Sequence, residues 1–281
     1  MATISSTIKR LLGALLYRMG DLHYANNELL VVNYHSTPKK FIPAFKKQIS
    51  FFEKHFDILH PNDLSNYFSK TLPLTKKPRL LFTFDDGLLN NLYAAQALEE
   101  RGHRGIFFVV PAFVHTSPSR QKDYYLKFIR PLIDANVDHL DEDFTAMSWQ
   151  DLQGLQSKQH VIGSHSLTHS MTGQDNDEKS IAEILSSKEQ LVSALGTPID
   201  SFCSINNTLL SVNAKQKAWI ASNYRFHFTT LPGLNSEEAN PLFILRRNIE
   251  CYWPMGQVLF AIGKMDLKRW DKSRATYRQL G

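Results

Sequence analysis

Two adjacent carboxylates stand at the end of an apolar run in this chain. Asp85 and Asp86 follow the sequence RLLFTF (79–84) and precede Gly87. Neighbouring carboxylates in a partly desolvated place repel each other, and a bound cation is the simplest compensation. Gly87 lets the backbone turn, so that both side chains can reach one site. The alternative is that one of the two aspartates caps the helix that follows.

A second polar segment, SHSLTH (164–169), places His165 and His169 four residues apart after another strand-like run. If this segment begins with a helical turn, the two imidazoles point to the same side. Two imidazoles and a carboxylate form the usual ligand set of a catalytic zinc, with a fourth position left for water. The two segments together therefore predict a divalent metal site. Zn²⁺ suits it best, while Co²⁺, Ni²⁺ and Mn²⁺ accept the same ligands.

Alternating strand-like and helical segments must position these residues. Strand-like runs cover 29–34, 79–84, 106–110, 160–163, 199–204, 224–229 and 242–245, and helical patterns cover 43–56, 88–100, 149–156 and 177–195. Repeated β-then-α units predict a parallel sheet that is buried on both faces. So many units within 281 residues favour a closed or nearly closed (β/α) barrel, where chemistry occurs at strand ends. The absence of a GxGxxG turn argues against a dinucleotide-binding sheet.

Three regions lie outside this alternation. We expect residues 1–28 to form an N-terminal amphipathic helix, with its apolar stripe at Ile8, Leu11, Leu12, Leu15, Leu16 and Met19. The stripe either packs on its own domain or lies on an anionic membrane surface. Residues 29–262 are expected to form the barrel, with an insertion at about 111–147 that contains a helix near 124–134. Residues 263–281 form a basic tail, expected to be solvated, with six basic and two acidic residues.

Composition excludes several classes of protein. A chain with 43% hydrophobic and 21% charged residues is globular rather than disordered or coiled-coil. Cys203 and Cys251 are too few for a disulfide scaffold or a thiolate zinc site. The net charge of +5 comes without an aromatic-interleaved basic face, so we expect no nucleic-acid partner. No apolar run reaches the length of a membrane span, and no signal-peptide cleavage site follows the start, so we expect a cytoplasmic protein.

The two predicted metal-binding segments resemble those of the polysaccharide deacetylase family, the NodB homology domain of carbohydrate esterase family 4. TFDDG (83–87) and SHSLTH (164–169) occur in the family's order, and residues 147–169 resemble the usual approach to the second motif. VVNYHS (31–36), followed by FxxQ at 45–48, resembles the opening strand of one branch. The resemblance extends from 30 to about 250. It implies a distorted (β/α) barrel, seven-stranded, that hydrolyses an acetamido group on a sugar.

The resemblance also implies roles for individual residues. Asp86 would bind the metal with His165 and His169, and Asp85 would be the general base. An arginine after the strand-like FIL (243–245) would orient the base, and of two consecutive arginines we favour Arg246 because only one can face the site. The alternative for this arginine is a surface salt bridge. We expect His35, at the end of the first strand, to shape the site or bind substrate rather than to ligate the metal.

Two family features are missing. The Pro-aromatic-Gly segment that usually walls the site is replaced by FCSINNT (202–208), in which Asn206 is the nearest candidate to offer a backbone N–H to the oxyanion. The C-terminal Leu-x-His motif, which usually carries the general acid, has no counterpart in VLFAIG (258–263). The replaced wall is more polar, and the proton donor to the leaving amine is not identified.

The sequence therefore predicts a metal-dependent hydrolase that removes the N-acetyl group from an N-acetylated sugar. A lipid-linked sugar or a precursor of a surface polysaccharide suits the basic ends and the amphipathic start, which also predict peripheral membrane association. Two alternatives remain open: a deformylase or O-deacetylase on a related sugar, and a catalytically inactive glycan-binding relative.

Overall fold

A computed structural model describes residues 5–130, apart from 19, 21 and 23, together with 144–205, 212–263 and 270–279. The strands within these ranges are β1 (Glu28–Tyr34), β2 (Asp57–Ile58), β3 (Arg79–Phe84), β4 (Gly105–Val109), β5 (Val161–Ser164), β6 (Ser201–Cys203), β7 (Phe226–Phe228), β8 (Asn235–Ser236) and β9 (Arg247–Asn248). The helices are α1 (Ser6–Arg18), α2 (Ile42–His55), α3 (Leu64–Phe68), α4 (Asn91–Glu99), α5 (Pro111–His115), α6 (Pro118–Tyr124), α7 (Trp149–Ser157), α8 (Asp177–Ile181), α9 (Ser187–Leu195), α10 (Ala214–Asn223), α11 (Met255–Ile262) and α12 (Asp271–Gln279).

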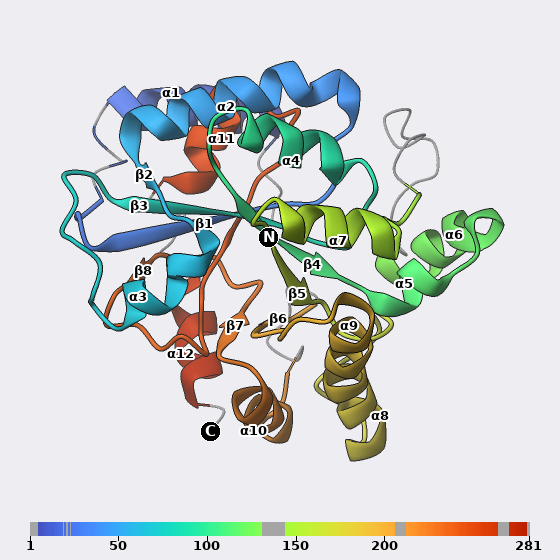
Figure 1. Cartoon of the computed structure of the whole chain (residues 1–281). Coiled ribbons are helices and arrows are strands. Elements are labelled where there is room, and N and C mark those ends of the chain that lie inside the picture. The colour runs from blue at the N-terminus through green and yellow to red at the C-terminus, as the bar shows by residue number, and fades with distance from the viewer. Residues whose placement is uncertain are drawn as a thin grey trace.

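The strands form one curled sheet with the order β7-β6-β5-β4-β3-β1-β8, surrounded by helices (Figure 1). The neighbouring pairs from β1 to β7 are parallel, whereas β8 is antiparallel to β1. β9 pairs in parallel with β1, and Ile244 just before it bridges Phe228 of β7. The segment 244–248 thus spans the gap between the first and last parallel strands. This confirms the predicted distorted (β/α) barrel, with seven strands on its main path.

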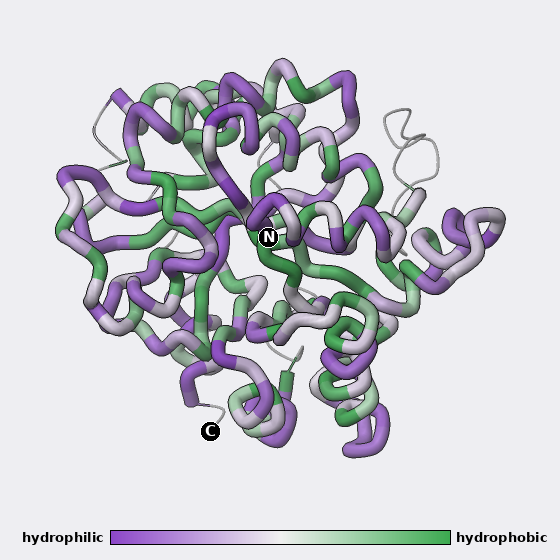
Figure 2. The backbone as a smooth tube through the Cα atoms, viewed as in Figure 1, coloured by the Kyte–Doolittle hydropathy of each residue, from purple (hydrophilic) through white to green (hydrophobic). Residues whose placement is uncertain are grey.

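Alternate side chains of each strand enter two different cores. One set fills the barrel interior and includes Leu29, Val31, Leu81, Ile106 and Phe108. The intervening residues pack outward against the helices, among them Leu30, Val32, Phe82, Phe84 and Phe107. Both faces of the strands are therefore apolar. Figure 2 shows the strands in largely green, hydrophobic colour, while the outer helices carry purple, hydrophilic segments.

The helices begin and end where the sequence supplies caps. Ser148 and Asp151 form a capping box at the start of α7, and Asn213 and Gln216 do the same for α10. The predicted helix over 177–195 comprises α8, a π-helical turn (Ala182–Ser186) and α9. It ends at Gly196, whose φ of 68° suits glycine.

The insertion at 111–147 contains more helix than the sequence indicated, and its predicted helix begins earlier. The helix predicted near 124–134 is present, but it begins earlier than predicted: α6 begins at Pro118, which suits a first helical position, and continues into a π-helical turn that ends at Ile129. The end of the predicted helix, at 131–134, lies outside the described residues.

The expectation of a solvated basic tail is also wrong for residues 271–279. They form α12, and the Tyr277 side chain is 3% exposed, with its ring stacked 4.8 Å from that of Phe243. Burial of this aromatic ring holds α12 on the barrel wall. No helix in the described part of the chain is both long and apolar enough to cross a membrane.

Candidate metal centre and active site

The two aspartates leave the barrel at the carboxyl end of β3. The backbone N–H of Asp85 donates to the carbonyl of Tyr34 at 2.9 Å, which continues the β1–β3 ladder by one residue. Asp86 and Gly87 then both adopt φ of 73°, in the left-handed region. This reversal turns two successive side chains, which an extended strand would point apart, into one buried place. Both carboxylates are 2% exposed.

The two histidines approach from β5, two strands away in the sheet. His165 follows Ser164 directly, and His169 lies four residues further along the same loop, which continues to α8. In each imidazole, Nε2 lies 3.6 Å from Oδ1 of Asp86. The structure therefore brings together the three residues that the sequence predicted as metal ligands.

Backbone carbonyls fix the tautomers of both histidines. Nδ1 of His165 lies 3.1 Å from the carbonyl oxygen of Cys203, and Nδ1 of His169 lies 3.0 Å from that of Phe128. A carbonyl only accepts, so each Nδ1 carries the proton and each Nε2 presents its lone pair to Asp86. Burial lowers the pKa of His165 to about 4, which keeps this imidazole neutral and able to bind a cation.

The donor set fits a divalent cation. One ligand atom from each of Asp86, His165 and His169 lies within 4.8 Å of the others. Oδ2 of Asp86 is buried without a hydrogen-bond partner in the described structure, a costly state that a cation would relieve. Asp85, His165 and Cys203 form a second such group, but burial raises the pKa of the Cys203 thiol. A protonated thiol is a poor ligand, so the first group is the better site.

Backbone strain is concentrated at this place. Five non-glycine residues in the described ranges have positive φ, and three of them, Asp86, Ser166 and His169, belong to the two motifs. Such conformations persist only where the surroundings hold them and are common at functional sites.

Glu183, which sequence reasoning missed, is one of these supports. Its Oε2 accepts from the backbone N–H of Thr168 at 2.9 Å, and its Oε1 accepts from the hydroxyls of Thr168 and Ser170. The side chain comes from the π-helical turn between α8 and α9 and is 3% exposed. It clamps the loop one residue before His169. Its only sequence signal is an acidic residue on the buried face of a helix.

Asp85 is paired with Arg246 across the closing point of the barrel. Nη1 and Nη2 of the guanidinium donate to the two carboxylate oxygens at 2.7 and 2.9 Å. Burial alone would raise the pKa of Asp85, but the charge and hydrogen bonds of Arg246, together with the neighbouring His165 and His35, hold the pKa well below the usual range. Asp85 therefore stays ionised, as a proton acceptor must be.

Three further hydrogen bonds fix the guanidinium itself. Arg246 donates to Oδ1 of Asn33 at 3.0 Å, to the carbonyl of Thr229 at 2.9 Å and to the hydroxyl of Thr83 at 3.5 Å. Asn33 lies in β1 and Thr229 directly follows β7, so these bonds join the two strands that flank the closing segment. The next residue, Arg247, points the other way and donates to the carbonyl of Gly263 at 2.5 Å. The alternation along the segment thus selects Arg246 for the site.

His35 lies beside the two aspartates. Tyr34 pairs with Phe84 in the sheet, so His35 leaves β1 at the same level as Asp85 leaves β3. Its Nδ1 makes an ion-pair contact of 3.5 Å with Oε1 of Glu250. Burial disfavours the charged imidazole, but Glu250 outweighs this and raises the pKa of His35. Asp86 acts in the same direction, and Arg130 opposes it.

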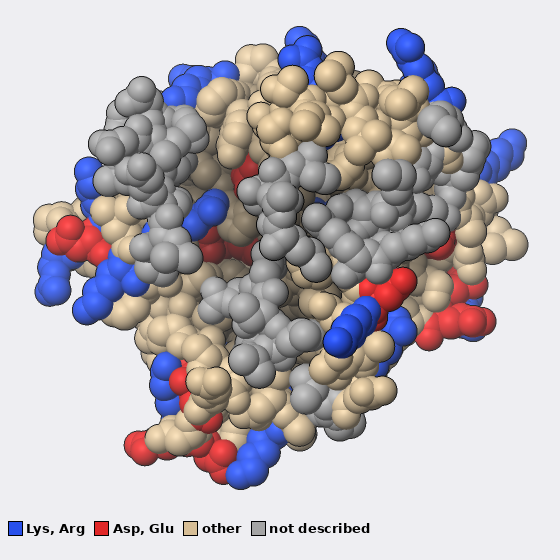
Figure 3. All heavy atoms as spheres, turned by 180° about the vertical axis from the view of Figure 1, so that it is seen from behind, with Lys and Arg blue, Asp and Glu red and all other residues tan. Residues whose placement is uncertain are grey.

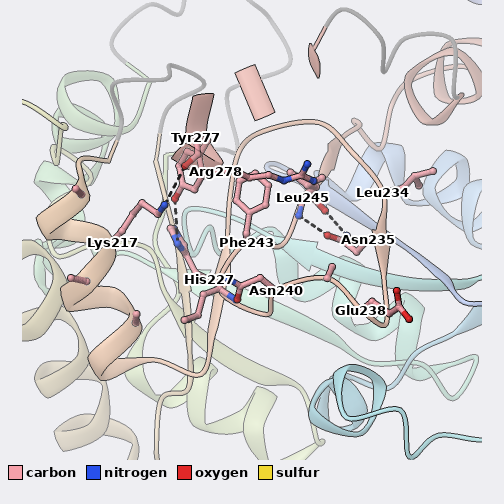
Figure 4. Close-up of a pocket in the computed structure, with 15 residues that line it drawn as sticks. Lys217, His227, Leu234, Asn235, Glu238, Asn240, Phe243, Leu245, Tyr277 and Arg278 are labelled. Atoms are coloured by element: carbon pink, nitrogen blue, oxygen red, sulfur yellow. Dashed lines mark hydrogen bonds between the residues drawn. The ribbon is translucent and has the colours of Figure 1, made fainter. Parts of the chain in front are cut away.

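The predicted oxyanion donor, Asn206, lies outside the described residues. A separate pocket of about 530 Å³ lies outside the barrel wall, between α10, the segment after β7 and α12 (Figure 4). His227 lines it and shares a 2.6 Å hydrogen bond with Ser204, while burial lowers the pKa of His227 to about 3. None of the residues that line this pocket is a predicted metal ligand, so it is distinct from the metal centre.

Comparison with solved structures finds the same fold at low sequence identity. A Streptococcus pyogenes deacetylase, PplD, in complex with acetate is 15% identical and superposes with a TM-score of 0.62, covering 85% of this chain and 99% of its own. IcaB from Ammonifex degensii is 17% identical with a TM-score of 0.60, covering 86% and 100%. The BpsB deacetylase domain from Bordetella bronchiseptica is 16% identical with a TM-score of 0.60, covering 80% and 97%. No curated protein sequence matches significantly.

The sequence match is decisive for the family. The family model described as polysaccharide deacetylase matches residues 74–215, half of the chain. This range contains both aspartates and both histidines of the metal centre. The chain therefore belongs to the polysaccharide deacetylase family of carbohydrate esterase family 4, hydrolases that act on the amide bonds of N-acetylated sugars.

Proposed function

We propose that this protein is a divalent-metal-dependent enzyme that removes the N-acetyl group from an N-acetylated sugar, and that Zn²⁺ is the metal its ligands suit best. The observation that carries the proposal is the convergence of two Nε2 atoms, each with its tautomer fixed, on one oxygen of Asp86. Two imidazoles and one carboxylate are the ligands that zinc takes in hydrolytic sites.

Asp86, His165 and His169 would hold the cation. When bound there, a divalent cation polarises the amide carbonyl and makes the attacking water more acidic. Asp85 is placed to accept the proton of that water. Its pairing with Arg246 keeps the carboxylate ionised and holds it in a fixed orientation, and a general base needs both.

His35 is our candidate for the missing proton donor. The sequence predicts a site-shaping or substrate-binding role for it, but its contact with Glu250 favours the protonated imidazole on the same side of the barrel as Asp85. A protonated histidine can transfer its proton to the leaving amine, after which Glu250 holds the ring in place. This arrangement supplies an acid without the C-terminal histidine that the family motif leads one to expect.

The substrate is an N-acetylated sugar of a lipid-linked glycan or surface-polysaccharide precursor, processed in the cytoplasm. Support comes from the family and from the basic residues of the N-terminal helix. Deformylation or O-deacetylation of a related sugar uses the same groups and is the second candidate. The polar segment that replaces the family's third motif is the feature that favours it.

The test begins with metal content. We expect about one equivalent of transition metal in the purified protein. It should be lost in an Asp86→Ala/His165→Ala/His169→Ala variant and kept in His103→Ala, a surface histidine paired with Glu53. Absence of metal in the wild-type protein after reconstitution would refute the metal-dependent hydrolase.

Acyl release then separates the candidate reactions. Acetate from N-acetylated sugars supports the proposal, whereas formate from N-formyl sugars or acetate only from O-acetyl sugars supports the second candidate. An inactive glycan-binding protein would show sugar affinity that survives Asp85→Asn and no turnover with any metal. His35→Ala is expected to lower kcat by about 10²–10⁴-fold while metal content stays the same.

A further inference from the structure

Helix α1 carries an exposed apolar stripe. Ile8, Leu11 and Leu15 lie on one face of this helix, at spacings of three and four residues, and are 54%, 68% and 54% exposed. Single exposed leucines are ordinary on protein surfaces, but three on one helical face form a patch. Of the predicted stripe, Leu12 and Leu16 are only half-buried. The expectation that the whole stripe packs on its own domain is therefore wrong.

The opposite face of α1 is what holds the helix to the body of the protein. Gly13 meets Gly256 of α11 so closely that a Cβ on Gly13 would lie 1.9 Å from the Gly256 carbonyl oxygen. At the end of the helix, the Tyr17 hydroxyl hydrogen-bonds Nε2 of His55 in α2 at 3.1 Å. Because these contacts fix the rotation of α1 about its axis, the apolar stripe cannot turn inward without breaking them.

One cation lies on the same face as the stripe. Helix α1 contains three basic residues and no acidic one, and Arg18 follows Leu11 by two helical turns on the same face, whereas Lys9 and Arg10 lie toward the face that packs on α11. Figure 3 shows the side of the molecule opposite Figure 1. Along its upper edge, which α1 and α2 both reach in Figure 1, Lys and Arg side chains stand among uncharged ones and no acidic side chain is visible.

We propose that this face of α1 docks on an anionic lipid surface. Apolar side chains at the level of the acyl boundary, with arginines reaching the phosphates, are the means by which interfacial helices bind. A protein partner would have no equal need for a cation on the face of the stripe and for the absence of acidic residues from the helix. Several cations near an anionic leaflet add to the binding and make it sensitive to salt. The proposal specifies the membrane association suggested above, but it holds whether or not the enzyme deacetylates a sugar.

The test is vesicle co-sedimentation of the full chain. We expect at least tenfold tighter binding to vesicles of phosphatidylcholine and phosphatidylglycerol (7:3) than to phosphatidylcholine alone, with the difference lost in 1 M salt. Leu11→Glu/Leu15→Glu and Arg18→Glu should each weaken binding to the anionic vesicles at least tenfold. Leu74→Glu, at a leucine that is 86% exposed elsewhere, is the matched control and should bind as the wild type does.

Equal binding to both vesicles, binding to neither, or unchanged binding by the Leu11→Glu/Leu15→Glu variant would overturn the proposal. A dimer in solution that this variant dissociates would also overturn it, since the face would then join two copies. Circular dichroism and activity on a water-soluble substrate should be unchanged in the variant. Loss of vesicle binding with full activity separates this surface from the active site.

Discussion

Replacing Arg246 with methionine leaves the Asp85 carboxylate buried without its guanidinium partner. The wild-type pair is 2–3% exposed and joined by two charge-assisted hydrogen bonds of 2.7 and 2.9 Å. Removal of one member of a buried ion pair typically costs about 3–5 kcal/mol, because the remaining charge is not solvated. Removal of both members costs much less. We therefore expect Arg246→Met to lower the free energy of unfolding by about 3–5 kcal/mol, and Asp85→Asn to recover most of that loss.

Urea unfolding of the two single variants and the double variant, in the presence of a chelator, measures this coupling. The chelator matters because a cation at Asp86 would compensate the unpaired charge of Asp85 next to it. We expect a coupling free energy of about 2 kcal/mol or more. Arg247→Met is the control: its side chain points away from Asp85, so it should be additive with Asp85→Asn within about 0.5 kcal/mol.

An additive Arg246→Met/Asp85→Asn pair would refute the reasoning, since it would mean that the buried carboxylate does not depend on Arg246. A loss of less than about 1 kcal/mol in Arg246→Met alone would do the same. Enzyme activity is an independent test of the role of Asp85. Asp85→Asn should reduce kcat/KM by about 10²–10⁴-fold, as for a lost general base.

Three further predictions concern other parts of the structure. Glu183→Ala should weaken metal binding about 10–100-fold in a chelator competition, and Glu183→Gln less so, because the clamp on the loop before His169 is lost; equal affinities would contradict the role of this support. The pKa of buried His227 is lowered to about 3, below its unfolded value of about 6.5, so the unfolded chain binds the extra proton between these pH values. The free energy of unfolding should therefore fall as pH falls from about 6.5 to about 3, and His227→Gln should flatten this dependence in urea titrations at several pH values; an unchanged slope would exclude His227 as its source. Gly13→Leu should cost about 1–3 kcal/mol through its clash with α11, measured by urea unfolding against Gly154→Leu, where a Cβ meets nothing within 4 Å; equal losses in the two variants would argue against the close helix contact.

Much of the barrel was predictable because its information is local. The run 79–84 is β3 to the residue, and the helical pattern over 177–195 matches α8 to α9. Apolar runs bounded by turn residues fix strands that are buried on both faces. The metal-binding residues follow two of these strands directly, and the carboxyl ends of parallel strands meet at one edge. Position along the sequence was therefore enough to bring Asp86, His165 and His169 together.

Other features depend on contacts between distant segments. The choice between Arg246 and Arg247 follows from the register of the closing segment with β1, and the pairing of His35 with Glu250 joins residues far apart in the chain. Burial of Tyr277 packs the basic segment 271–279 against the barrel wall. The charge of this segment alone did not indicate that packing.

The N-terminal helix shows most clearly which features the sequence determines and which the tertiary structure decides. Its sequence determines an amphipathic helix with leucines and basic residues, because hydrophobic periodicity is a local property. Only the tertiary structure decides which face is buried: Gly13 permits a close contact with α11 that turns Ile8, Leu11 and Leu15 outward. The sequence thus determined the elements and the metal-binding residues, whereas packing decided which partners those elements meet, since burial depends on surfaces that only the folded chain brings together.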